Sequence, residues 1–168
     1  MGSLGSPHRQ QAALAAISRQ LAAAADVLGA LVVGSLAAGT ADAASDIDLI
    51  ICTRPGRFAE AWARRHELLA TGELVSWDDQ SQTTTEIAVH RWVTPDLVLV
   101  EALFAAPGSG VRLAQPWTLI TGEPEATAAF PARPPINRSE MNRDAAHPVD
   151  QAFDDLKTAL RRLAAGDA

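Results

Sequence analysis

Apolar and polar residues alternate along the chain with two different periods, and together these predict a mixture of helices and strands. Helical spacing predicts helices at His8 to Leu28, Phe58 to Ala70 and Val149 to Ala165. Short apolar runs bounded by Gly, Pro, Thr and Asp predict strands between them. The strands are expected at Ala30 to Val33, Asp46 to Cys52, Glu73 to Trp77, Thr84 to Val93, Asp96 to Leu103 and Trp117 to Thr121. This order suits a layered α/β (α+β) fold, with a small mixed sheet flanked by helices.

The chain is expected to form one domain, because 168 residues are enough to bury a substantial core. Residues 1–123 are interpreted as the core of that domain. Residues 124–168 begin with a Pro-rich stretch and are interpreted as a wrap and a final helix packed on the same domain. Within the core, Asp78 to Thr83 is expected to be a polar, solvated loop, and the arginines Arg57, Arg64 and Arg65 are expected on solvated faces.

Composition excludes several classes of function. A net charge of −6 offers no basic field for a nucleic-acid backbone, so no nucleic-acid partner is expected. Cys52 is the single cysteine, which excludes intrachain disulfides and multi-cysteine metal sites, and it is most simply a core residue. No apolar run approaches the roughly 18 residues that span a bilayer. Ala22 to Ala44 resembles a secretory segment but is interrupted by Asp26, so a cytoplasmic protein with no membrane partner is expected.

The stretch Leu31 to Cys52 carries the most informative chemistry. An apolar run stops at Gly34-Ser35, ten residues follow, and Asp46 and Asp48 then open a second apolar run. Side chains alternate along a strand, so the two aspartates are expected on one face. Two adjacent carboxylates repel each other, and such a pair is usually tolerated through exposure, a shared proton or a bound cation.

This pattern, with Ser45 ahead of the first aspartate, resembles the signature of the polymerase-β-type nucleotidyltransferases. The closest likeness is to the small members, the minimal and the antibiotic-modifying enzymes. The resemblance implies that Gly34, Ser35 and Ser45 bind the nucleotide and that Asp46 and Asp48 hold two Mg²⁺ ions. It also implies transfer of a nucleoside monophosphate from an NTP co-substrate to a hydroxyl of a small molecule or protein, with release of pyrophosphate. Carboxylate oxygens suit Mg²⁺, and a pair of such ions suits phosphoryl chemistry.

A third carboxylate has to complete the metal site and take the proton of the acceptor hydroxyl. Asp96 and Glu101 fall on the same expected strand five residues apart, so they face opposite sides of the sheet. In the family the third acid typically opens an apolar strand, as Asp96 does here, and Asp96 is therefore the predicted metal ligand and catalytic residue. Glu101 is the second candidate and Glu86 a more distant one. His90 is interpreted as a strand residue whose imidazole is satisfied.

The chain departs from the family in one respect that leaves other functions open. Small members often carry a basic residue before the second glycine of the turn, whereas Ala38 precedes Gly39 here. Only one helix is expected after the core, so acceptor binding is expected to need a homodimer or a partner protein. The alternatives are an antitoxin-like module that binds a helical, toxin-like protein, and a degenerate member that binds ligand without nucleotidyl transfer.

Overall fold

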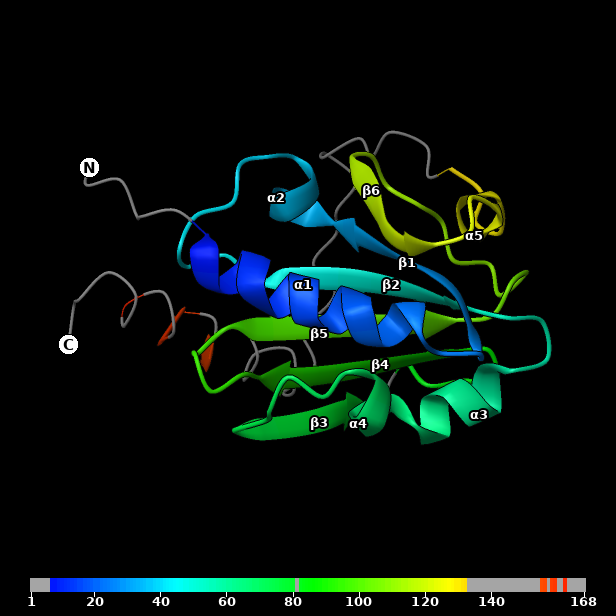
Figure 1. Ribbon diagram of the computed structural model, residues 1–168, viewed down its shortest axis with the longest axis horizontal. Coiled ribbons are helices and arrows are strands. Elements are labelled where there is room, and N and C mark those ends of the chain that lie inside the picture. Colours follow the sequence, from blue (N-terminus) through cyan, green and yellow to red (C-terminus); the bar gives the residue numbers. More distant parts are fainter. Residues whose placement is uncertain (1–6, 81, 133–154, 157, 160–161, 163–168) are drawn as a thin grey trace.

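A six-stranded mixed sheet forms the centre of the computed structural model, which describes residues 7–80, 82–132, 155–156, 158–159 and 162 (Figure 1). The strands are β1 (Val27–Val33), β2 (Ile47–Thr53), β3 (Val75–Asp79), β4 (Ile87–Val93), β5 (Leu99–Ala105) and β6 (Trp117–Gly122). The helices are α1 (His8–Ala22), α2 (Gly34–Ala37), α3 (Phe58–Ala63), α4 (Arg65–Leu68) and α5 (Glu125–Ala128). The predicted fold class, a small mixed sheet flanked by helices, is confirmed.

The strand order is β3-β4-β5-β2-β1-β6, and the parallel pairing of β2 with β5 lies at its centre. The other neighbouring strands pair antiparallel. A parallel pair needs a long crossover, and here α3, α4, β3 and β4 lie between β2 and β5 in sequence. The amino ends of β2 and β5 therefore lie side by side, and the residues that begin these strands are neighbours in space.

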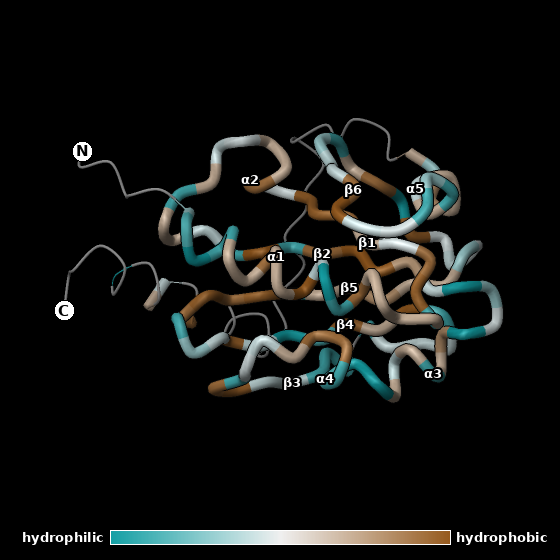
Figure 2. Tube along the Cα trace, viewed as in Figure 1, coloured by the Kyte–Doolittle hydropathy of each residue, from teal (hydrophilic) through white to brown (hydrophobic). Residues whose placement is uncertain are grey.

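The main core lies between the sheet and helices α1, α3 and α4. Ile17 and Leu21 of α1 pack in one cluster with Ile47, Leu49 and other alternate residues of the central strands. Burying an aliphatic side chain of this size stabilises the fold by about 1.5–3 kcal/mol. Apolar residues run along the central strands, whereas α4 and the outer loops are more polar (Figure 2). The main core is therefore formed on one face of the sheet.

A second apolar cluster lies on the opposite face. It joins Leu31, Ile50 and Cys52 of the sheet to Ala126 and Phe130, at and after α5. Cys52 is fully buried, and its burial raises the pKa of the thiol to about 11, in keeping with a core residue. Among the residues that the structure describes, no helix is long and apolar enough to cross a membrane.

The first two predicted helices differ from those observed. The first ends at Ala22, and Leu28 belongs to β1. The alanines before Asp26 favour a helix locally, but tertiary contacts override that propensity by fixing Asp26 at the entry to β1. The second predicted helix is divided into α3 and α4 at Arg64, whose backbone leaves the helical region.

Two later predictions also need correction. Asp78 and Asp79 belong to β3 and not to a loop. Asp79 is 3% exposed and forms an ion pair with Arg91. The stretch predicted to be irregular after Gly122 contains the short helix α5. The predicted helix 149–165 lies largely outside the described residues, and those described within it are helical.

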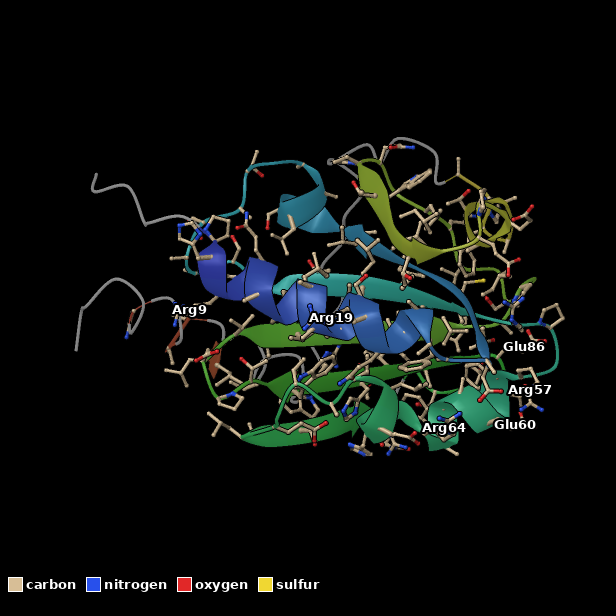
Figure 3. The ribbon with its side chains drawn as sticks, viewed as in Figure 1. Arg9, Arg19, Arg57, Glu60, Arg64 and Glu86 are labelled. Carbon is tan, nitrogen blue, oxygen red and sulfur yellow. The ribbon has the colours of Figure 1, made fainter. Side chains whose placement is uncertain are left out.

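An ion-pair cluster around the buried Asp26 fixes the start of β1 to helix α3. Asp26 is 3% exposed, and its carboxylate lies 2.6 Å from Arg57 Nη2 and 3.1 Å from Arg64 Nη1. Arg57 and Arg64 lie together with Glu60 around α3 (Figure 3). The hydrogen bond from Arg57, together with the charges of both guanidinium groups, holds the pKa of the Asp26 carboxyl below its ordinary value, although burial opposes the shift. These two arginines, expected to be only solvated, therefore also have a structural role.

Replacement Asp26→Asn is expected to lower the melting temperature at pH 7 and to flatten the acid side of the stability profile. A carboxylate whose pKa is lowered in the folded state stabilises above its unfolded pKa, and that stability is lost as pH falls through the folded value, below about pH 4. Thermal unfolding between pH 3 and 7 measures this. Glu60→Gln is the control, because Glu60 is exposed and lies 3.4 Å from Arg57. Equal profiles for wild type and Asp26→Asn would contradict the assignment.

Candidate active site

Two acidic side chains from the central parallel strands share one face of the sheet. Ile47 and Leu49 belong to the main core under α1, so the alternation of β2 turns Asp48 to the opposite face. Asp48 pairs in register with Glu101 of β5. Residues paired in this way lie about 4.8 Å apart across strands and project to the same side. The structure thus brings two carboxylates together from β2 and β5.

Asp46 lies just before this arrangement. It precedes Ile47, the first residue of β2, and is half-buried. One residue, Ile47, separates it from Asp48, and the chain becomes extended at Ile47. Its place on the same side of the sheet as Asp48 stays a prediction.

Gly34 lies directly against the carboxylate of Asp48. Its φ of +68° is a left-handed conformation, and a Cβ at this position would lie 2.7 Å from Asp48 Oδ2. A side chain there would force the carboxylate to move. The left-handed backbone and the close approach of Asp48 therefore both favour glycine at this position. The neighbouring Ser35 is half-buried at the start of α2, and its carbonyl accepts a hydrogen bond from the Thr40 amide at 3.0 Å. The predicted Gly-Ser turn and Asp48 therefore lie next to each other in space.

Hydrogen bonds shape the loop that leads to Asp46. The Ser45 hydroxyl donates to Asp42 Oδ1 at 3.1 Å and accepts from the Asp42 amide at 3.0 Å. Gln10, which is 2% exposed, donates from Nε2 to the carbonyls of Ala43 and Ser45 at 3.0 and 2.8 Å. These contacts fix the approach of the chain to β2. The Ser45 hydroxyl is engaged within the loop, and its nucleotide contact stays a prediction.

Asp96 does not open β5, so the prediction that it begins this apolar strand is wrong. The strand begins at Leu99, and Asp96 lies in an exposed turn beside Leu97, whose φ is 59°. Arg9, at the amino end of α1 (Figure 3), donates to the Asp96 carbonyl at 2.9 Å and to the Ala43 carbonyl at 3.0 Å. The backbone of Asp96 is thus tied to the loop before β2, while the register position opposite Asp48 belongs to Glu101.

Glu86, the most distant candidate, lies at the other end of these strands. It precedes β4, and its carbonyl accepts a hydrogen bond from Ala106, which follows β5. Asp48 and Glu101 lie in the amino-terminal half of their strands. The register therefore separates Glu86 from the acidic pair.

Arg91 orients Glu101, and sequence reasoning did not single it out. It pairs in register with Glu101, and its Nε donates to Glu101 Oε2 at 2.6 Å. Its Nη1 donates to Asp79 Oδ2 at 2.7 Å. The Arg91 side chain is 6% exposed and that of Glu101 is 31% exposed. The Glu101 carboxylate is therefore partly open to solvent, while the buried Arg91 holds it in place. The signal in the sequence was an arginine inside a predicted strand, with Val89 and Val93 two positions away on the same face.

The donor set of this site fits a hard divalent cation. Asp48 and Glu101 supply carboxylate oxygens, which are the ligands that Mg²⁺ prefers. Gly34 has no side chain and therefore leaves space beside the Asp48 carboxylate. A cation there would offset the repulsion between the paired carboxylates.

The site combines three features: a central pair of parallel strands, two acidic residues paired across these strands, and a Gly-Ser turn beside one of the acids. Together they define a class of α+β domain that is suited to phosphate chemistry. A family model described as the nucleotidyltransferase domain matches residues 14–101, more than half of the chain. The chain belongs to this family, and the predicted membership of the polymerase-β-type nucleotidyltransferase superfamily is confirmed. No curated protein matches the chain. The family assignment indicates nucleotidyl transfer in general terms.

Replacement Gly34→Ala is expected to cost about 1–2 kcal/mol through the left-handed backbone, and to weaken Mn²⁺ binding as well, because the new Cβ displaces the Asp48 carboxylate. Urea unfolding and electron paramagnetic resonance of Mn²⁺ measure the two effects. Gly39→Ala is a matched control: its φ is also +68°, but a Cβ at that position has no neighbour within 4 Å. Equal loss of Mn²⁺ affinity in the two variants would contradict the close approach of Gly34 to Asp48.

Proposed function

We propose that the protein is a metal-dependent nucleotidyltransferase that moves a nucleoside monophosphate from an NTP to a hydroxyl of a small molecule or protein. One observation carries the proposal: Asp48 and Glu101 pair across the parallel strands, on the face opposite the main core and beside Gly34. Family membership and the Gly-Ser turn support it. The proposal places the protein in the cytoplasm, as expected from its sequence.

The residues divide into two functions. Asp46, Asp48 and Glu101 would hold two Mg²⁺ ions, since three carboxylates offer hard oxygen ligands. Bound Mg²⁺ would offset phosphate charge and stabilise the attacking and leaving oxygens. Gly34 lets the backbone approach the triphosphate closely, and Ser35 offers a hydroxyl and an amide to its oxygens.

The transfer itself is a displacement at the α-phosphorus. The acceptor oxygen forms a bond to that phosphorus, the bond to the β-phosphate oxygen breaks, and pyrophosphate leaves. We assign the proton of the acceptor hydroxyl to Glu101, whose partly exposed carboxylate Arg91 holds by a hydrogen bond to Oε2. The other oxygen of this carboxylate, Oε1, is proposed as the acceptor of the proton.

Glu101 replaces Asp96 as the proposed third carboxylate. Asp96 precedes an apolar run in the sequence, which is why the sequence predicts it as the third acid. In the structure a turn at Leu97 follows Asp96, and the strand begins only at Leu99. The register then gives the position across from Asp48 to Glu101. A role for Asp96 in contact with nucleotide or acceptor is the competing assignment, and the two are separable by mutation.

Incubation with labelled NTPs, Mg²⁺ and a panel of hydroxyl-bearing acceptors tests the proposal. Asp48→Asn and Glu101→Gln are each expected to reduce transfer by about 100-fold or more, because each removes a ligand and a charge at the reacting phosphate. Asp96→Asn is expected to retain most of the transfer, and Glu86→Gln is the matched control at the far end of the strands.

Three results would contradict the proposal. Transfer by Asp48→Asn at the wild-type rate would remove the acidic pair from the reaction. Loss of transfer in Asp96→Asn, together with normal transfer in Glu101→Gln, would show that Asp96 and not Glu101 is the third carboxylate. If the wild type is stabilised against heat by NTP and Mg²⁺ but transfers to no acceptor, the protein binds ligand as a degenerate member of the family.

A further inference from the structure

A second group of potential metal ligands lies on the helix-covered face of the sheet. His66 of α4, Glu73 before β3 and His90 of β4 each offer one ligand atom, and these atoms lie within 4.8 Å of one another. His66 Nδ1 is 3.3 Å from Glu73 Oε1, and His90 Nε2 is 3.5 Å from the same oxygen. Because side chains alternate along β4, His90 projects to the opposite face from Arg91 and the acidic pair. The group is therefore separate from the proposed nucleotidyl-transfer site.

The hydrogen bond of His90 to Asp78 fixes which ring nitrogen faces the group. The imidazole is 1% exposed, and its Nδ1 lies 2.8 Å from Asp78 Oδ1. Arg65 donates two hydrogen bonds to Asp78, at 3.0 and 2.7 Å, so this carboxylate acts as an acceptor and Nδ1 of His90 carries the proton. The Nε2 atom then points a lone pair toward Glu73. It is buried without a hydrogen-bond partner among the described residues.

A lone pair and a carboxylate oxygen facing each other at 3.5 Å need a positive charge between them. Either a second proton on His90 or a metal ion supplies it. In a tetrahedral zinc site, ligand distances of about 2.0–2.1 Å place neighbouring nitrogen and oxygen ligands about 3.3–3.4 Å apart. The two distances to Glu73 Oε1 match this spacing. The half-exposed His66 side chain can move to shorten the remaining edge.

The surroundings of His90 are also those of a metal ligand. A histidine that binds zinc commonly donates its other ring N–H to a carboxylate, which fixes the ring and raises its basicity. Asp78 occupies that position here. Trp92 stacks on the imidazole with ring centroids 5.5 Å apart, so the ring is held in place before any ion binds.

We propose that His66, Glu73 and His90 bind a Zn²⁺ ion, with Asp78 as the carboxylate that orients His90. Two imidazoles and one carboxylate are a known zinc donor set, and the partial exposure of His66 leaves a fourth position for water or an exogenous ligand. The ion joins α4 to β4 and to the segment that leads into β3. Bound zinc therefore stabilises this side of the sheet against unfolding.

The test uses the full-length chain, freed of any histidine tag and of metal, with Mg²⁺ in excess to occupy the carboxylate site. Zn²⁺ affinity is measured by competition with a chromophoric chelator, and Co²⁺ is used as a spectroscopic probe of tetrahedral coordination. The wild type is expected to bind one ion with intense visible Co²⁺ bands and an increase in melting temperature. His66→Ala and Glu73→Gln each change a partly exposed side chain, and each is expected to weaken binding by at least about tenfold. His8→Ala, at an exposed histidine of α1, is the control and keeps wild-type affinity.

Two outcomes would overturn the proposal. Absence of Zn²⁺ binding and of visible Co²⁺ bands in the wild type would show that His66, Glu73 and His90 do not form a metal site. Zn²⁺ affinity unchanged in both His66→Ala and Glu73→Gln would place the ion elsewhere on the chain. Circular dichroism of each variant confirms that it is folded before its affinity is compared.

Discussion

The parallel register of β2 with β5 is the constraint on which the rest of the structure depends. It sets Asp48 beside Glu101, and it requires a crossover that α3, α4, β3 and β4 supply. Packing α1, α3 and α4 on one face of the sheet gives the main core there. The acidic pair then falls on the other face, where its charge does not have to be buried in that core.

Buried and half-buried ion pairs hold the elements around this register. Arg91 bridges Asp79 and Glu101 across β3, β4 and β5, and Asp26 fixes the entry of β1 through two arginines. Breaking such a pair by removing one partner is costly, because it leaves an uncompensated charge behind. The same contacts orient Glu101 for the proposed chemistry, so the stability of the sheet and the geometry of the site depend on shared residues.

The sequence predicted the fold and the two segments that bring Gly34 against Asp48, because hydrophobic periodicity and the Gly-Ser and Asp-x-Asp motifs are local signals. It gave the wrong start for β5, because that depends on a turn in which Leu97 takes a left-handed conformation and the Thr94 hydroxyl accepts the Val98 amide. Parity along the predicted strand does not apply to Asp96, because Asp96 lies in the turn before β5, and only the register with β2 shows that Glu101 lies opposite Asp48. The group around His90 joins residues far apart in sequence, which periodicity does not reveal.

The most direct test of the central claim is an anomalous difference map from crystals grown with Mn²⁺ and a non-hydrolysable NTP. Mn²⁺ accepts the same oxygen ligands as Mg²⁺ and scatters anomalously. A peak bound by the carboxylates of Asp48 and Glu101 is expected, with the triphosphate beside Gly34 and Ser35. A peak bound by Asp96 in place of Glu101, or nucleotide bound with no metal at Asp48, would contradict it.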